Sequence, residues 1–233
     1  MAHWQICASP PASISNNMSL DWQLFHEMEA GLLEPTIRVY TWNEPGVTYG
    51  YLQDVKDVRR VIEANRGQET GVRSQERELA PVIASGAKQS LAGNSFREIA
   101  SSMTPRNDGV VPIYPPDLAR RPTGGGIVFH DIDEVVYCLV APADSKLLPG
   151  KLTEAYLVIS ELICEGLNEL GYPVSVSRLA KQGLQRSIRE LCFAEAEEYE
   201  IVLGDKKIVG SAQRRTKNTI LQQGTIKVGE LVG

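Results

Sequence analysis

Residues 120–131 read Arg-Arg-Pro-Thr-Gly-Gly-Gly-Ile-Val-Phe-His-Asp, with a glycine triplet between two arginines and an apolar run. Its three consecutive glycines lack side chains, so their backbone can adopt positive φ and approach a ligand closely. Arg120 and Arg121 add fixed charge that suits a phosphate or a carboxylate. No Gly-Lys-Ser/Thr follows, so the segment is not a P-loop. A bare glycine triplet is also typical of a flexible turn, but this one runs directly into a strand pattern.

The sequence after the glycines predicts strands and one long helix. Leu152–Leu170 has apolar residues at helical spacing, and Gly171 is the expected end of that helix. Gly204-Asp205 is a two-residue turn that suits a hairpin. Val135–Val140 is apolar on both faces, as expected for a central, covered strand. The predicted strands of this part are residues 127–130, 135–140, 199–203, 206–210 and 219–226.

The sequence before the glycines predicts a helix, two strands and a second helix. Asn16 and Asn17 are good N-caps, and Leu20, Leu24 and Met28 fall on one face of the helix that follows. We therefore expect an α+β fold with a mixed, largely antiparallel central sheet and flanking helices. The later elements of this part are strands at 38–42 and 47–51 and a helix at 54–65.

A segment at about 67–110 differs from the rest of the chain in composition. Gly, Ser, Arg, Gln and Glu dominate it, and a loop of this length is uncommon in a compact domain. Its parts at 82–90 and 99–108 resemble the translated interspersed repeats found within some bacterial genes. We interpret it as a disordered in-frame insertion into a single domain that spans 1–233, since long surface insertions cost little loop entropy. An ordinary variable loop is the alternative.

Size and composition limit the class of protein. A chain of 233 residues fits one globular domain, and its net charge of −5 with a pI of about 5.4 argues against a broad nucleic-acid surface. The sequence contains no apolar run long enough for a membrane span and no signal-peptide pattern. The dispersed cysteines predict reduced thiols rather than disulfides or a metal site, so we expect a cytoplasmic protein. They are Cys7, Cys138, Cys164 and Cys192.

A second candidate motif follows the predicted hairpin turn. Lys207 stands on a strand just after the turn, where a lysine is usually a solvated charge. The small residues Gly210, Ser211 and Ala212 follow it and would leave room for a substrate beside the lysine. Alone, this pattern is compatible with a solvated lysine and with a lysine that binds a substrate.

Together the two motifs, Arg120–Asp131 and Lys207–Ala212, resemble the signature pair of the lipoate–protein ligase and octanoyltransferase family. Asn17–Asp21 is similar to the family's N-terminal helix, and Trp42-Asn43 and Gly50–Gln53 to its next two elements. The resemblance covers most of the chain outside the insertion. It implies a biotin/lipoate protein ligase-like catalytic domain, with an acyl pocket beside the central sheet that the glycine-rich loop closes. The accessory part that many ligases carry at the C-terminus is expected to be absent.

The resemblance also implies roles for individual residues. Lys207 would hold the acyl carbonyl, where a cation stabilises the charge that develops on the oxygen during attack. His130 is expected in the site, although a structural hydrogen-bonding role is the alternative to catalysis. No metal ligands are expected. The residues expected to bind the substrate or a nucleotide are Arg121, Thr123, Gly124, Gly125, Gly126, Ile127, Val128, Phe129, His130, Gly210, Ser211 and Ala212.

Cys192 points to one branch of the family. Leu191–Glu195 is similar to the Cys-Phe segment of the octanoyl-transferring branch, in which a cysteine is the nucleophile and the acyl group passes through a thioester. A thiolate is a good nucleophile, and a nearby ammonium such as Lys207 would favour it. The ligase branch usually shows an Asn-Asp pair in this region, where this chain has Glu197–Glu200. A plain buried cysteine is the alternative reading of Cys192.

Three functions are therefore open. The first is transfer of an octanoyl or lipoyl group through Cys192 to the lysine of a lipoyl carrier domain, with no tightly bound cofactor. The second is ATP-dependent lipoate–protein ligation through lipoyl-AMP, with ATP and Mg²⁺. The third is an inactive acyl- or carrier-binding remnant. The implied partners are the glycine cleavage H protein, the E2 subunits of 2-oxoacid dehydrogenases and, as a further candidate, acyl carrier protein. At Gln223 many relatives have a histidine, so any role of that histidine is lost here.

Overall fold

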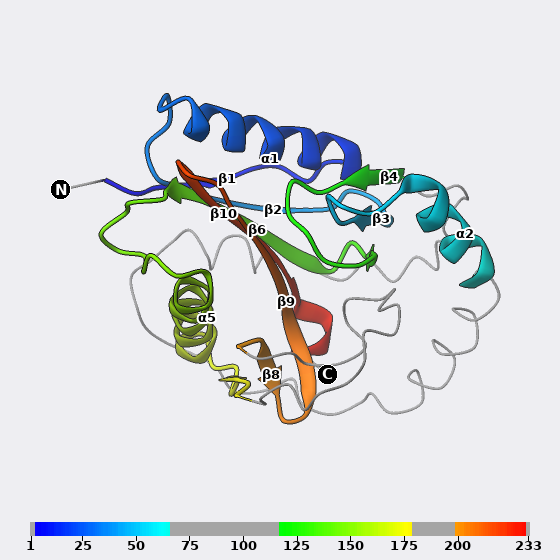
Figure 1. Cartoon of the computed structure of the whole chain (residues 1–233). Helices are drawn as coiled ribbons and strands as arrows, with labels where there is room; N and C mark the ends of the chain where they lie inside the picture. Colours follow the sequence, from blue (N-terminus) through cyan, green and yellow to red (C-terminus); the bar gives the residue numbers. More distant parts are fainter. Residues whose placement is uncertain (1–2, 66–116, 179–198, 232–233) are drawn as a thin grey trace. The chain divides into compact units, whose positions relative to one another are not determined.

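The computed structural model describes residues 3–65, 117–178 and 199–231 (Figure 1). The chain divides into two compact units, residues 1–53 with 110–232 and residues 54–109 with 233. The segment at about 67–110 that we interpret as an insertion lies outside the described residues. The elements in chain order are β1 (Gln5–Ala8), α1 (Ile14–Glu29), β2 (Thr36–Thr41), β3 (Gly46–Tyr49), α2 (Val55–Asn65), β4 (Asp117–Arg120), β5 (Val128–His130), β6 (Glu134–Pro142), α5 (Leu152–Glu169), β7 (Ser175–Val176), β8 (Ile201–Leu203), β9 (Lys206–Arg215), β10 (Thr219–Lys227) and η1 (Val228–Glu230).

The first unit is built on two sheets. Seven strands form the larger sheet in the order β1-β2-β6-β10-β9-β8-β7, in which only β1 and β2 pair in parallel. Three strands form the smaller sheet in the order β4-β3-β5. The expected α+β fold with a mixed, largely antiparallel sheet is therefore confirmed. The central strand β6 is buried along nearly its whole length, as its apolar sequence predicts.

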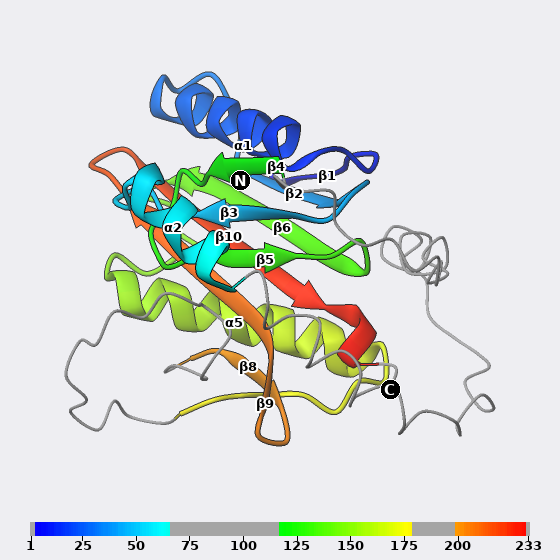
Figure 2. The same cartoon turned by 90° about the vertical axis from the view of Figure 1, so that its right-hand side faces the viewer.

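Helices α1 and α5 lie on opposite sides of the larger sheet (Figure 1). Figure 2 shows β4 of the smaller sheet next to α1, and α1 contacts β4 and β3 as well as β6 and β10. Helix α5 contacts β7 and β9. It ends where Gly171 takes a φ of +92°, as the sequence predicts. None of the described helices combines the length and apolarity that crossing a bilayer requires.

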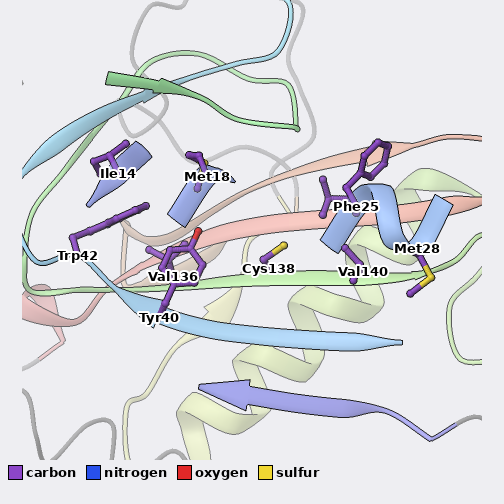
Figure 3. Close-up of a cluster of buried hydrophobic side chains, with 10 residues drawn as sticks. Ile14, Met18, Phe25, Met28, Tyr40, Trp42, Val136, Cys138 and Val140 are labelled. Carbon is purple, nitrogen blue, oxygen red and sulfur yellow. The ribbon is translucent and has the colours of Figure 1, made fainter. Parts of the chain in front are cut away.

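Helix α1 packs its apolar side on the sheet, and Figure 3 shows this cluster of buried side chains. The predicted start of the helix was wrong, and its predicted face was right in part, since Met28 is buried and Leu24 packs against the cluster but Leu20 does not. Ser13 is the N-cap, with its side chain accepting a hydrogen bond from the Asn16 N–H, and Leu20 is 43% exposed. The residues buried on α1 include two polar ones, which a search for apolar periodicity passes over. The helix buries Ile14, Asn17, Met18, Asp21, Phe25 and Met28.

A polar network is buried within this apolar contact. Arg38 of β2 donates to Asp21 Oδ1 at 2.7 Å and also to Asn17, and the Arg38 and Asp21 side chains are 3% and 0% exposed. Tyr40 Oη donates to Asp21 Oδ2 at 2.7 Å, and Gln223 Nε2 of β10 donates to the same oxygen at 2.6 Å. Burial raises the pKa of Asp21, while Arg38 and the hydrogen bonds from Tyr40 and Gln223 oppose the rise. This network joins α1 to two strands of the sheet.

The hairpin and the second unit agree with their sequence patterns. Strands β8 and β9 flank the Gly204-Asp205 turn, in which Gly204 has a φ of +60°, as a primed turn requires.

Helix α2 belongs to the second unit and begins after Asp54, whose Oδ1 accepts the Lys56 N–H at 2.7 Å. Within this helix Arg60 and Asp57 form an exposed ion pair at 3.0 Å.

We predict that Asp21→Ala lowers the free energy of unfolding by about 3–5 kcal/mol, because it leaves the Arg38 guanidinium buried without its carboxylate. Asp57→Ala removes the same kind of partner from an exposed arginine and should cost less than about 1 kcal/mol. Urea unfolding followed by circular dichroism measures both losses. Equal losses in the two variants would contradict a structural role for the buried pair.

Candidate functional site

The glycine-rich loop, residues 121–127, connects β4 to β5 across the end of β3. The Arg121 N–H donates to Tyr49 O at 2.9 Å, and the Tyr51 N–H donates to Thr123 O at 2.8 Å. A Cβ atom on Gly50 would lie 2.1 Å from Gly125 O, so only glycine at position 50 permits this close approach. Gly125 itself has a φ of +93°. The glycines therefore allow the loop to fold back on β3.

Arg121 holds this loop from within. Its side chain donates to Thr48 Oγ1 at 2.7 Å, to Gly124 O at 3.0 Å and to Gly126 O at 2.7 Å. The residue is 7% exposed. Arg121 thus donates both to the backbone of the loop and to the Thr48 side chain on β3. Any contact of Arg121 with an acyl group or a nucleotide stays a prediction.

His130 continues the same chain of hydrogen bonds. Its Nε2 lies 2.8 Å from Thr48 Oγ1 and its Nδ1 lies 2.8 Å from Glu134 Oε2, so both ring nitrogens have protein partners. A neutral imidazole that donates from Nδ1 to the carboxylate and accepts the Thr48 O–H satisfies both contacts. Trp42 Nε1 donates to the same Glu134 oxygen at 3.3 Å. These contacts support the structural role of His130 over a role as a base.

Two side chains tie the loop to the larger sheet. Thr123 Oγ1 donates at 2.8 Å to Gln223 Oε1, whose amide nitrogen donates to Asp21 on α1. Arg214 of β9 donates to Pro122 O at 3.1 Å. The loop therefore lies on the α1 side of the larger sheet, over β9 and β10. Gln223 therefore supports the loop.

The remaining expected residues of the first motif lie at different depths. Ile127 is 1% exposed and Val128 is 8% exposed, so their side chains belong to the core. Phe129 is partly buried and Gly125 is exposed. The glycine backbone is thus the accessible part of the motif, whereas the residues that follow the glycines pack in the core.

Lys207 lies at the start of β9 and is buried. Its Nζ is 2.6 Å from Glu200 Oε1, and the two side chains are 5% and 6% exposed. Our expectation allowed for a solvated lysine at this position, and the structure excludes that alternative. A buried ammonium needs a counter-charge, which Glu200 supplies.

The pairing of β8 with β9 shifts by one residue beside Lys207. Ile201 pairs with Val209, whereas Val202 pairs with Lys207, so β9 carries one extra residue at this point. Cross-strand partners share a face of the sheet, and successive residues of a strand alternate between faces. Lys207 therefore lies on the face opposite Val209 and Ser211. Without the shift it would share their face.

The small residues of β9 divide between the two faces. Ser211 Oγ lies 2.7 Å from Tyr137 Oη, on the face away from α1. Gly210 and Ala212 alternate with it and so lie on the α1 side, where the glycine-rich loop is. The register shift places Lys207 on this same side. The structure therefore brings Lys207, Gly210 and Ala212 to the loop's face of the sheet and turns Ser211 away from it.

The cysteines differ in their environments. Cys192 lies outside the described residues, so its role stays a prediction. Burial raises the pKa of the Cys138 thiol far above its usual range and also raises that of Cys164, so both are held as neutral thiols. Cys7 is exposed on β1, four strand spacings or roughly 19 Å from β9. Cys138 and Cys164 are thus packing residues, as expected.

Several residues that build this site were not singled out from the sequence. Three of them are polar residues in or beside strands, namely Thr48, Glu134 and Glu200. Nothing in the sequence except this position next to a strand indicates that they belong to the site. Asp21 and Gln223 lie within segments that we compared with the family, but their side chains had no assigned role. Nowhere in residues 3–65, 117–178 and 199–231 do three or more His, Cys, Asp or Glu side chains gather in a way that could hold a metal ion.

Comparison with known proteins identifies the family. The lipoyl protein ligase A/B catalytic domain matches residues 115–229, which include both motifs. The octanoyltransferase LipM of Halalkalibacterium halodurans is 30% identical over 231 residues, and that of Bacillus subtilis is 30% identical over 227 residues. The matches cover 97% and 96% of this chain but only 66% and 64% of those relatives. The chain therefore spans just under two thirds of their length.

A solved structure shares the fold. The crystal structure of a lipoate-protein ligase A bound with ATP superimposes with a TM-score of 0.52 at 17% identity, covering 97% of this chain and 66% of that one. At this identity the likeness concerns the fold alone. Sequence match, shared fold and the two motifs agree: the chain belongs to the lipoyl protein ligase A/B catalytic domain family.

Proposed function

We propose that this chain is the catalytic part of an octanoyltransferase that attaches an octanoyl group to the acceptor lysine of a lipoyl carrier domain. The observation that carries the proposal is the buried Lys207, which lies on the face of the sheet that the glycine-rich loop covers. The relatives named octanoyltransferase LipM support octanoyl transfer rather than ligation. The glycine cleavage H protein and the E2 subunits of 2-oxoacid dehydrogenases are the candidate acceptors.

The reaction has two acyl-transfer steps. The Cys192 thiolate attacks the carbonyl carbon of an octanoyl thioester on a donor such as acyl carrier protein, and the donor thiol leaves with a proton. The acceptor lysine amine then attacks the Cys192 thioester, which forms an amide and returns the cysteine thiol. An amide is more stable than a thioester, so the second step makes the transfer favourable. No ATP and no tightly bound cofactor is required.

Lys207 assists both steps in this proposal. Negative charge grows on the carbonyl oxygen as a thiolate or an amine attacks, and an ammonium in a site that excludes water stabilises that charge strongly. The backbone of Gly124–Gly126 can approach the acyl chain closely because it carries no side chains. The contacts of Arg121 with Gly124 and Gly126 keep this backbone in one conformation.

We predict that Cys192→Ala abolishes the octanoyl adduct that forms when the protein is incubated with octanoyl-loaded carrier protein. Intact-mass measurement detects the adduct, which hydroxylamine should remove because it cleaves thioesters. Cys7→Ala is the matched control, since Cys7 lies exposed on the distant strand β1, and it should keep the adduct. If Cys192→Ala instead retains lipoylation that depends on ATP and lipoate, the protein is a ligase and the proposal is wrong.

We predict that Lys207→Ala lowers the single-turnover rate of octanoyl transfer by about 10²–10³-fold, because it removes the cation that faces the developing oxyanion. Lys206→Ala is the matched control, since this neighbouring lysine is exposed, and it should transfer at the wild-type rate. Rapid-quench measurement with octanoyl-loaded carrier protein gives both rates. A wild-type rate for Lys207→Ala would remove this residue from the mechanism.

A further inference from the structure

The ion pair between Lys207 and Glu200 differs from the exposed pairs of this protein. Its N–O distance is 2.6 Å and both side chains are at most 6% exposed. Lys151 and Glu154 form the same kind of pair at 2.9 Å, but their side chains are 80% and 52% exposed. Water and salt screen an exposed pair, whereas a buried ammonium depends on its carboxylate. Removal of Glu200 should therefore affect Lys207 far more than removal of Glu154 affects Lys151.

The backbone beside Glu200 is held in an uncommon conformation. Tyr199 has a φ of +69°, and within the part of the chain that the structure describes it is the only non-glycine residue with positive φ. Such a conformation is unfavourable for a bulky residue and persists only where its surroundings enforce it. Two hydrogen bonds to Ser177 do so here: the Tyr199 N–H donates to Ser177 O at 2.8 Å, and the Ser177 N–H donates to Glu200 O at 2.7 Å.

The strained residue, the carboxylate and the register shift are consecutive in the chain. Tyr199 precedes Glu200, and the shift between Ile201 and Val202 follows it directly. The shift turns Lys207 to the loop's face, and Glu200 then contacts its ammonium. One short segment therefore determines both the direction and the counter-charge of the lysine.

We infer that Glu200 is a positioning residue for Lys207, which fixes the ammonium on the face of the glycine-rich loop and compensates its charge. This inference rests on the proposed function, in which Lys207 acts on the acyl carbonyl. An ammonium has three N–H donors, so a contact with one carboxylate oxygen is compatible with donation to a substrate oxygen. Glu200 acts through Lys207 and does not itself meet the reacting atoms.

The first test compares kcat and KM in Glu200→Gln, which keeps the shape and the hydrogen-bonding capacity of the side chain but removes its charge. We expect kcat for octanoyl transfer to fall about 10- to 100-fold, with little change in KM. The size of the effect is taken from metal sites, where removing a carboxylate that orients a ligand residue lowers activity by this factor. Glu200→Asp keeps the charge on a shorter side chain and should recover part of kcat. Glu154→Gln is the matched control and should leave both constants unchanged. Wild-type kcat in Glu200→Gln would overturn the inference.

The second test is a double-mutant cycle with Lys207→Ala, measured by single-turnover rates. If Glu200 acts through Lys207, Glu200→Gln should slow the reaction in the wild-type background but change it little in the Lys207→Ala background. An equal slowing in both backgrounds would show a general structural role and overturn the inference. Circular dichroism establishes that each variant is folded, and if Glu200→Gln is not, Glu200→Asp takes its place in the cycle.

A third measurement separates this inference from the proposed function. Urea unfolding of the same four proteins gives the coupling of Glu200 and Lys207 in stability, which needs no activity. If the wild-type protein transfers no octanoyl group, the proposed function fails, and the stability cycle alone decides whether Glu200 holds Lys207. Non-additive losses of stability would support that contact, and additive losses would overturn it.

Discussion

The buried pair of Asp21 and Arg38 is the interaction on which the rest of the unit depends. Two opposite charges removed from water are stable only when their geometry is good and their remaining hydrogen-bonding groups are satisfied. Tyr40 and Gln223 complete the bonding of the carboxylate. Helix α1 can meet these demands in one orientation only, with Asp21 turned into the sheet. The apolar cluster then packs around this orientation.

The glycine-rich loop takes its position from this network. Glycines have no side chains with which to hold a conformation, so the loop needs partners elsewhere. Thr123 supplies one link, through Gln223 to the α1 network, and Arg121 supplies a second, through Thr48 to His130. Packing of α1 and order in the loop are thus coupled. Residues of the core that touch no substrate therefore shape the site.

Much of the fold follows from local patterns in the sequence. The long helix α5, the central strand β6 and the hairpin at Gly204-Asp205 each have a clear period or turn signal, and all three are confirmed. The buried face of α1 was predicted only in part: Met28 is buried as expected, whereas Asn17 and Asp21 were missed because they are polar and enter the core by bonding to Arg38 of another strand. The short strands β1, β4 and β7 were also missed, since two to four residues give no reliable period.

The sequence by itself determined the two motifs, the hairpin that presents Lys207 and the family, because these depend on residue type and spacing along the chain. It could not determine the direction of Lys207. Simple alternation along β9 would place that lysine on the face of Ser211, and only the one-residue shift against β8 reverses this. Strand register arises from pairing between segments, and so does the contact of Lys207 with Glu200. The tertiary structure decided both, because each depends on which strands meet and at which residues.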